Sequence, residues 1–176
     1  MSSSDRTQSA ARRLVLAGLL SLPLAACMRP MYGPASGTNA STAEQLAAID
    51  IVPIPERFGH YLSEDLRFAL HGGNAASSFR YRLEVTVIRS VVTPIIDTQT
   101  GRADVATTRG EAYFKLTKYE GGPILVDGRA TGSASYDRLT QRYAGLRAGI
   151  DSEKRIAEEL ADQIRTRLAA YFTSQS

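Results

Sequence analysis

Residues 151–172, DSEKRIAEELADQIRTRLAAYF, carry the most regular pattern in the chain. Apolar side chains recur there at steps of three and four residues, the period of one face of an α-helix. The positions that share this face are Ala157, Leu160, Ala161, Ile164, Leu168 and Tyr171. A helix that begins at Asp151 or Ser152 and ends at about Phe172 is roughly 30 Å long, enough to cross a whole sheet. Burying one Leu or Ile contributes about 1.5–3 kcal/mol, so a charge at Leu160 or Ile164 should unfold the domain.

A second amphipathic helix is predicted upstream, over residues 56–70. Its apolar positions also recur every three or four residues, at Phe58, Leu62, Leu66, Ala69 and Leu70. We expect this helix to end at Gly72, because glycine accommodates the left-handed backbone of a helix C-terminus. His71 lies in the last turn, where capping free backbone carbonyls is a more ordinary role for histidine than binding a ligand.

The first strands are predicted on either side of this helix. Ile49, Ile51 and Ile54, interrupted by prolines, predict a short strand near a sheet edge, where a missing amide donor is tolerated. Residues 81–87 alternate apolar and polar side chains, as a strand with one wet face does. The alternation is lost over residues 88–96, which predicts a bulge or a strand end that projects beyond the sheet.

Two longer strands follow, over residues 102–119 and 124–136. Turn-forming residues at 97–101 and 120–123 join them to their neighbours as hairpins. On the last strand, small residues occupy one face and would let a helix approach the sheet closely. The predicted order is therefore strand, helix, strand, strand, strand, helix. A mixed four-stranded sheet with both helices on one face satisfies this order most simply, so we predict a two-layer α+β domain.

The N-terminus predicts a lipoprotein signal peptide over residues 1–26. Arg12 and Arg13 precede the apolar run 14–22, which is shorter than the ~20 residues of a transmembrane helix. The sequence Leu-Ala-Ala-Cys at 24–27 resembles the bacterial lipobox, whose cysteine receives a diacylglyceryl thioether before cleavage. We therefore expect lipid on Cys27, with acyl chains that hold the domain at a membrane surface. The alternatives are an ordinary signal peptide in which Cys27 is incidental, and a buried membrane stub.

The rest of the chain divides into a linker and one domain. Residues 27–47 are rich in Pro, Gly, Ser and Thr without an apolar period, so we expect a flexible lipidated tether. A single α+β domain is then predicted over residues 48–176. Since Met28 rather than an aspartate follows Cys27, export to the outer membrane is expected by resemblance to many Gram-negative lipoproteins.

Composition and motifs argue against several function classes. Three of the 21 basic residues and one of the 18 acidic residues lie in the first 26 positions, which leaves 18 bases and 17 acids in the mature chain. With so small a net charge, the mature chain lacks the positive electrostatic field by which proteins attract nucleic acid. One cysteine and two histidines make a metal centre improbable, and no cofactor is implied. Phosphate-loop, dinucleotide, nucleophile-elbow and zinc-protease motifs are absent, so we expect no enzyme, although a Ser–Lys or paired-carboxylate site stays open.

The arrangement of the chain resembles a known family. Cys27 is followed by Arg-Pro-Met-Tyr-Gly at 29–33, then by a short strand, a helix, two long hairpins and an amphipathic C-terminal helix, with Ser-Tyr-Asp at 135–137. This pattern is similar to the lipopolysaccharide-assembly lipoproteins of the LptE family, whose mature start reads Cys-x-x-Pro-Leu-Tyr-Gly. Met31 stands here in place of the leucine.

The resemblance implies a partner, a ligand and a place in the cell. Members of the family plug the outer-membrane β-barrel LptD, support its assembly and contact lipopolysaccharide on its way to the outer leaflet. The protein would be lipid-anchored to the cell outer membrane and face the periplasm or the barrel lumen. Because guanidinium groups bind phosphate bidentately, loop arginines are the expected lipopolysaccharide contacts. The first candidate is Arg102 at a hairpin tip, and the others are Arg138, Arg142 and Arg147 in the loop before the last helix.

Two other functions remain open from the sequence. An auxiliary lipoprotein of a lipid-transport ABC system would share the anchor, size and α+β layout, but would engage inner-membrane or periplasmic partners. A purely structural envelope lipoprotein is the other alternative.

Overall fold

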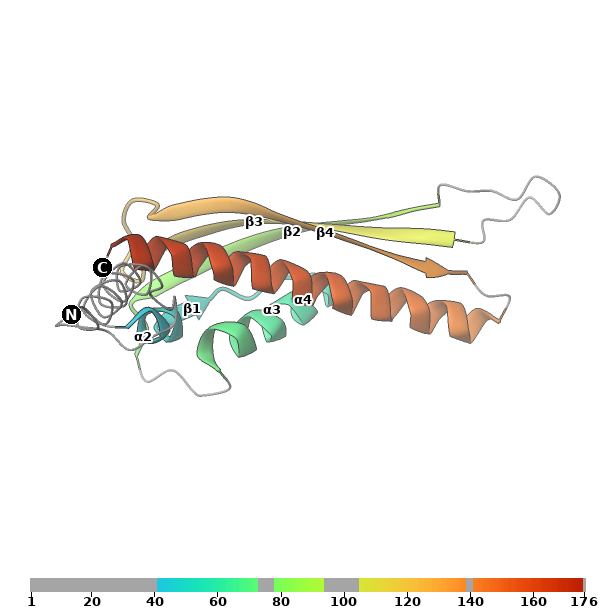
Figure 1. The fold of residues 1–176 in the computed structure, drawn as a ribbon, viewed down its shortest axis with the longest axis horizontal. Helices are drawn as coiled ribbons and strands as arrows, with labels where there is room; N and C mark the ends of the chain where they lie inside the picture. The colour runs from blue at the N-terminus through green and yellow to red at the C-terminus, as the bar shows by residue number, and fades with distance from the viewer. Residues whose placement is uncertain (1–40, 73–77, 94–104, 139–140, 176) are drawn as a thin grey trace, which may run out of the picture.

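The fold has two layers, a four-stranded sheet and a layer of helices that covers one of its faces (Figure 1). The computed structural model describes residues 41–72, 78–93, 105–138 and 141–175. In chain order the elements are α2 (Thr42–Ala47), β1 (Ile49–Ile51), α3 (Glu56–His71), β2 (Tyr81–Val92), β3 (Val105–Lys118), β4 (Val126–Asp137) and α4 (Arg142–Ser174). The predicted α+β class, mixed sheet and two main helices on one face are confirmed.

Strand order in the sheet follows the chain, β1-β2-β3-β4. β1 runs parallel to β2 because α3 crosses between them, whereas β2, β3 and β4 are antiparallel neighbours. β1 pairs only with residues 81–83 of β2. The other three strands are long and remain paired over almost their whole length, so the sheet is much longer than it is wide (Figure 1).

The core lies between the sheet and the two main helices. Leu160 and Ile164 of α4 are fully buried, as their place on the predicted apolar stripe requires. Alternate residues of β3 also face the helices, with Ala112, Phe114 and Leu116 almost completely buried. α3 covers only the part of the sheet near α2, while α4 extends along its full length (Figure 1).

A pair of glycines sets how closely α4 approaches the sheet. Gly110 of β3 and Gly132 of β4 lie directly opposite each other in the strand register. A Cβ atom at Gly110 would lie 2.7 Å from Ile156 Cγ2 and 2.9 Å from Phe58 Cζ, closer than side chains pack. A Cβ atom at Gly132 would lie 2.8 Å from Glu159 Oε2 and 3.2 Å from Ile156 Cγ2. The predicted role of small residues on the last strand is therefore confirmed, and Gly110 extends it to β3.

Side chains of α4 cover two positions on the outer edge of β4, Thr131 and Ser135. The Gln163 side chain accepts a hydrogen bond from the Thr131 amide (3.2 Å) and donates one to the Thr131 carbonyl (2.9 Å). Arg155 donates to the Ser135 carbonyl at 3.4 Å. The amide of Gln163 thus takes the place that a neighbouring strand would take. Such pairing protects a sheet edge from unwanted strand addition.

Part of the expected tether is helical. Helix α2 occupies the last six residues of the expected tether, 27–47. Ser41 and Glu44 form a capping box, in which each side chain accepts a hydrogen bond from the other residue's backbone amide. Leu46 of this helix is 2 % exposed and belongs to the core. The tether prediction was wrong for residues 42–47 because a short capped helix was read as linker composition.

Helix α4 also begins earlier, at Arg142 instead of Asp151 or Ser152. Gly145 and Gly149 weaken the helical pattern over its first turns. The Ser152 hydroxyl does not cap the helix; it donates to the Gly149 carbonyl (2.7 Å) and lies 2.9 Å from the Thr108 hydroxyl. This segment therefore contacts β3 through Ser152 and, through Gly149 beside Tyr136, β4.

Strand β2 continues to Val92 in unbroken register with β3, so neither the predicted bulge nor the alternative, a strand end beyond the sheet, occurs up to that residue; residues 94–96 of the predicted range lie outside the described residues. Apolar and polar residues do not alternate in the last residues of β2 because this part of the strand lies beyond α3, and its side chains are exposed to solvent on both faces of the sheet. Ile88 and Val91 are 54 % and 46 % exposed. Gly72 is the left-handed helix cap expected, with φ 61°, but His71 is bonded elsewhere: its Nε2 lies 2.9 Å from the Ile49 carbonyl of β1.

Candidate functional site

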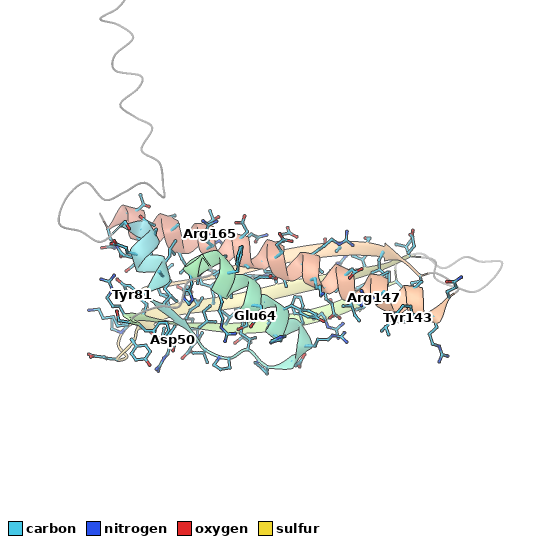
Figure 2. The ribbon with its side chains drawn as sticks, turned by 90° about the horizontal axis from the view of Figure 1, so that it is seen from below. Asp50, Glu64, Tyr81, Tyr143, Arg147 and Arg165 are labelled. Atoms are coloured by element: carbon cyan, nitrogen blue, oxygen red, sulfur yellow. The ribbon has the colours of Figure 1, made fainter. Side chains whose placement is uncertain are left out.

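The candidate site lies in the part of the domain beyond the N-terminal end of α3. Among the described residues, α4 is the one helix over the sheet here: its residues 142–153 lie over residues 105–110 of β3 and 132–137 of β4, while residues 87–92 of β2 extend past α3 and are largely exposed (Figure 1). We call this part the distal arm. Tyr143 and Arg147 mark its end in Figure 2, opposite the end that carries Tyr81.

A buried carboxylate holds the base of the distal arm. Glu153 of α4 is 5 % exposed and accepts two hydrogen bonds from Arg57 of α3, at 3.1 Å from Nε and 3.0 Å from Nη2. Arg89 of β2 lies 3.4 Å from the same carboxylate through Nη1. The bidentate hydrogen bond to Glu153 and the attraction of its charge raise the pKa of the Arg57 guanidinium. These ion pairs connect α3, α4 and β2. Since the cluster has two arginines and one glutamate, its net charge is positive.

A small cavity of about 170 Å³ opens beside this cluster. Its lining residues are Arg57, Arg89, Val91, Thr108, Tyr136, Gly145, Leu146, Gly149, Ile150 and Glu153. The lining combines two guanidinium groups and the carboxylate that pairs with them, the hydroxyls of Thr108 and Tyr136, and aliphatic side chains. Such a lining suits the junction of an anionic group and a hydrocarbon chain, because guanidinium binds phosphate or carboxylate while the apolar wall excludes water.

The apolar stripe of α4 continues into the distal arm, where no helix within the described residues covers it. At about 100° per residue, Tyr143, Leu146 and Ile150 fall on the same face as the buried Leu160 and Ile164. Beyond α3, however, Tyr143 is 73 % exposed and Leu146 is 58 % exposed. The arm therefore presents apolar surface that the rest of the chain buries.

Two of the predicted lipopolysaccharide contacts flank this exposed stripe. Arg142 and Arg147 are exposed and lie on either side of it, within an arc of roughly 140°. Both lie on α4, so their placement in a loop before the last helix was wrong; the cause is the early start of that helix. Arg138 is exposed, one residue past the end of β4. Arg102 and Cys27 lie outside the described residues.

Sequence reasoning missed Arg57, Arg89 and Glu153. Two local signals were available. Glu153 occupies a position four residues before Ala157 and seven before Leu160, so it interrupts an apolar stripe with a carboxylate. Arg89 likewise follows the inward-facing positions 83, 85 and 87 of its strand. A charge at an inward position predicts a paired group, but nothing local identifies its partner.

The described residues contain neither of two further kinds of site. In residues 41–72, 78–93, 105–138 and 141–175, no three His, Cys, Asp or Glu side chains gather as metal ligands would. None of the helices in these ranges has the length and apolar character needed to cross a membrane.

Known proteins resemble the chain in structure more than in sequence. No protein-family model matches it, and no curated protein matches it in sequence. A Caulobacter crescentus CB15 protein described as a candidate lipoprotein has a similar crystal structure, with a TM-score of 0.63 and 27 % identity over 75 % of this chain and 96 % of the other.

Two more distant solved structures share the fold. A minor lipoprotein from Acinetobacter baumannii gives a TM-score of 0.54 at 18 % identity, over 70 % of this chain and 92 % of its own. The rare lipoprotein B of Shewanella oneidensis gives 0.55 at 13 % identity, over 73 % and 96 %. The chain thus has the fold of these bacterial lipoproteins, which supports the expectation, drawn from its first 27 residues, that it is a lipoprotein.

Proposed function

We propose that this chain is an outer-membrane lipoprotein of the LptE kind, anchored through Cys27. In this proposal it occupies and helps assemble an LptD-like β-barrel, and its distal arm contacts lipopolysaccharide during insertion into the outer leaflet. No catalytic step is involved. The observation that carries the proposal is the uncovered apolar stripe of α4 in the distal arm, flanked by Arg142 and Arg147.

The chemistry of the distal arm suits an amphipathic anion. Lipid A joins phosphate groups to acyl chains, so a surface that recognises it needs cations beside apolar area. Arg142 and Arg147 supply guanidinium groups that can bind phosphate bidentately. Tyr143 and Leu146 supply the adjoining apolar area. The nearby cavity, with Arg57 and Arg89 on its wall, offers a second place of the same mixed character.

The open face of the sheet suits a polar barrel lumen. Lysine and acid alternate across it, with Lys115 of β3 between Glu84 of β2 and Asp127 of β4 in the strand register. Arg129 pairs with Glu111 at 2.8 Å on the same face. Porin-type barrels have polar interiors, and a face that neutralises its own charges can lie against such a wall without strong attraction to one charged group.

A pull-down tests the partner. The tagged, lipidated protein is purified from detergent-solubilised outer membrane, and its partners are identified by mass spectrometry. We expect one large β-barrel in an amount about equal to that of the bait. Recovery of ABC-transport components, or of no partner, would contradict the proposal. The Cys27→Ala variant should remain unprocessed or soluble in the same preparation.

A titration with lipopolysaccharide tests the ligand. Replacing Arg142 and Arg147 together by alanine should weaken binding by about tenfold, or roughly 1.4 kcal/mol shared between two exposed contacts. Arg67→Ala is the matched control, because Arg67 is also an exposed helical arginine but lies on α3. Arg102→Asp should weaken binding without changing Tm. Equal affinity of the double variant and the control would remove the distal arm from the proposal.

A further inference from the structure

The end of the domain opposite the distal arm carries a second group of exposed apolar side chains. Phe79 and Tyr119 are each 40 % exposed, and Ile124 is 52 % exposed. The rings of Phe79 and Tyr119 stack with their centroids 6.2 Å apart. They come from the residues before β2 and after β3, which the hydrogen bond from the Tyr119 amide to the Arg80 carbonyl (2.9 Å) holds together. We call this group the aromatic end.

Basic side chains accompany the aromatic end. The guanidinium of Arg82 lies 4.9 Å above the Tyr119 ring, a cation–π contact. Arg80 and Lys118 are exposed next to Phe79 and Tyr119. Glu120 lies in the adjacent turn and Asp50 is opposite Arg82 in the strand register, so the bases outnumber the acids. Aromatic rings beside Lys and Arg are typical of protein surfaces at a membrane–water interface.

Helix α2, the first element in the described part of the chain, lies at this same end. Ser41 caps α2, and the Thr42 hydroxyl lies 3.5 Å from the Thr173 hydroxyl near the end of α4. Figure 1 places α2, the end of α4 and the β3–β4 turn together, away from the distal arm. The first residues of α4 belong to the distal arm, and the 33 residues of this helix span about 50 Å. The two ends of the domain are therefore about that far apart.

The length of chain before α2 limits where the domain can lie relative to its anchor. Residues 28–40 separate Cys27 from Ser41. Even a fully extended chain of this length reaches only about 48 Å. A lipid on Cys27 therefore keeps Ser41, and the aromatic end beside it, within about 48 Å of the anchor, whereas the distal arm lies farther along the chain's path by the ~50 Å length of α4. Contacts too weak to bind a free protein then become effective, because tethering raises the local concentration.

We infer that the aromatic end rests on the leaflet that holds the lipid anchor. Phe79, Tyr119 and Ile124 lie in the interfacial region, and Arg80 and Lys118 reach anionic headgroups. This inference rests on the proposed acylation of Cys27. Its consequence is orientation, since contact at this end directs the long axis of the domain, and with it the distal arm, away from the leaflet.

Tryptophan fluorescence can test this contact, because the chain has no Trp and only one Cys. The mature chain is coupled chemically through Cys27 to maleimide lipid in vesicles of phosphatidylethanolamine and phosphatidylglycerol. In the Tyr119→Trp variant, we expect blue-shifted emission and at least about twofold quenching by nitroxide-labelled lipid. The matched control is Tyr143→Trp in the distal arm, which should keep its aqueous emission. Equal quenching of the two reporters would overturn the inference.

A second measurement separates membrane contact from other causes. Phe79→Ser with Ile124→Ser, added to the Tyr119→Trp chain, should abolish most of the quenching while circular dichroism stays unchanged. Emission that shifts with protein concentration, in the absence of vesicles, would show that a second copy covers the aromatic end and would also overturn the inference. Since the anchor is attached chemically, these outcomes do not depend on acylation in the cell or on lipopolysaccharide binding, which the Cys27→Ala and arginine variants test.

Discussion

Replacing Gly110 with alanine should destabilise the domain, although glycine is usually a poor strand residue. The added Cβ would lie 2.7 Å from Ile156 Cγ2 and 2.9 Å from Phe58 Cζ. Both side chains are in the core, at 0 % and 2 % exposure, so neither can turn away into solvent. Overpacking of this kind costs about 1–3 kcal/mol. Relief of the backbone entropy of glycine returns about 0.5–1 kcal/mol, so at the middle of both ranges the net loss is about 1 kcal/mol.

Urea denaturation followed by circular dichroism measures this change, and Gly149→Ala is the matched control. A Cβ at Gly149 has only ordinary contacts, the nearest at 3.4 Å from Tyr136 Oη. Since alanine is the better helix former by about 0.8–1 kcal/mol, this control should be stabilised. The Ile156→Ala change should reduce the penalty of Gly110→Ala, because the new methyl group then enters a cavity. A Gly110→Ala protein as stable as the wild type would refute the close packing of α4 on the glycine pair.

Three further predictions concern individual side chains. Glu153→Gln keeps the shape but removes the charge, and should lower the unfolding free energy by about 1 kcal/mol, since its arginine partners are partly exposed and can rehydrate; an equal loss in an Arg57→Ala, Arg89→Ala background would contradict this. Burial, and then Glu158 and Glu64, raise the pKa of Asp65, so the fold favours its protonated form. Asp65→Asn should therefore stabilise the protein at neutral pH in urea unfolding, and this gain should shrink as the pH falls through the raised pKa; a gain independent of pH would exclude the charge as its cause. Leu160→Ala, at a fully buried position, should cost about 2–5 kcal/mol in the same assay, and a loss below 1 kcal/mol would mean that α4 packs less tightly than described.

The sheet and the main helices could be predicted because their patterns are local. Phe114 and Leu116 alternate with polar neighbours, and Leu160 and Ile164 recur at helical spacing, so each element identifies its own buried face. Burial in the structure follows these faces. Where only one helix covers the sheet, the patterns weaken, and the predictions for the end of β2 and the start of α4 were wrong for that reason.

The candidate site was harder to predict because it depends on contacts between distant parts of the chain. Arg57 and Glu153 are 96 residues apart in sequence, and only the fold brings them together. Arg142 and Arg147 were identified as basic residues near the last helix, but their relation to an exposed apolar stripe required knowledge that α3 stops short of them. The sequence showed that these residues are basic. Only the structure shows that α4 extends beyond α3 and so exposes the apolar stripe between them.

The glycine pair has a mechanical consequence for that surface. Ile156, which lies over Gly110 and Gly132, is about 21 Å along α4 from Arg142 and about 24 Å from Phe172. If bulk added beneath Ile156 lifts the helix by about 1 Å while the Phe172 end stays in place, lever arithmetic moves the Arg142 end by about 2 Å. In this geometry α4 turns about its Phe172 end, and the two glycines fix how close the helix lies to the sheet at Ile156, so the close packing there sets the angle at which the distal arm points.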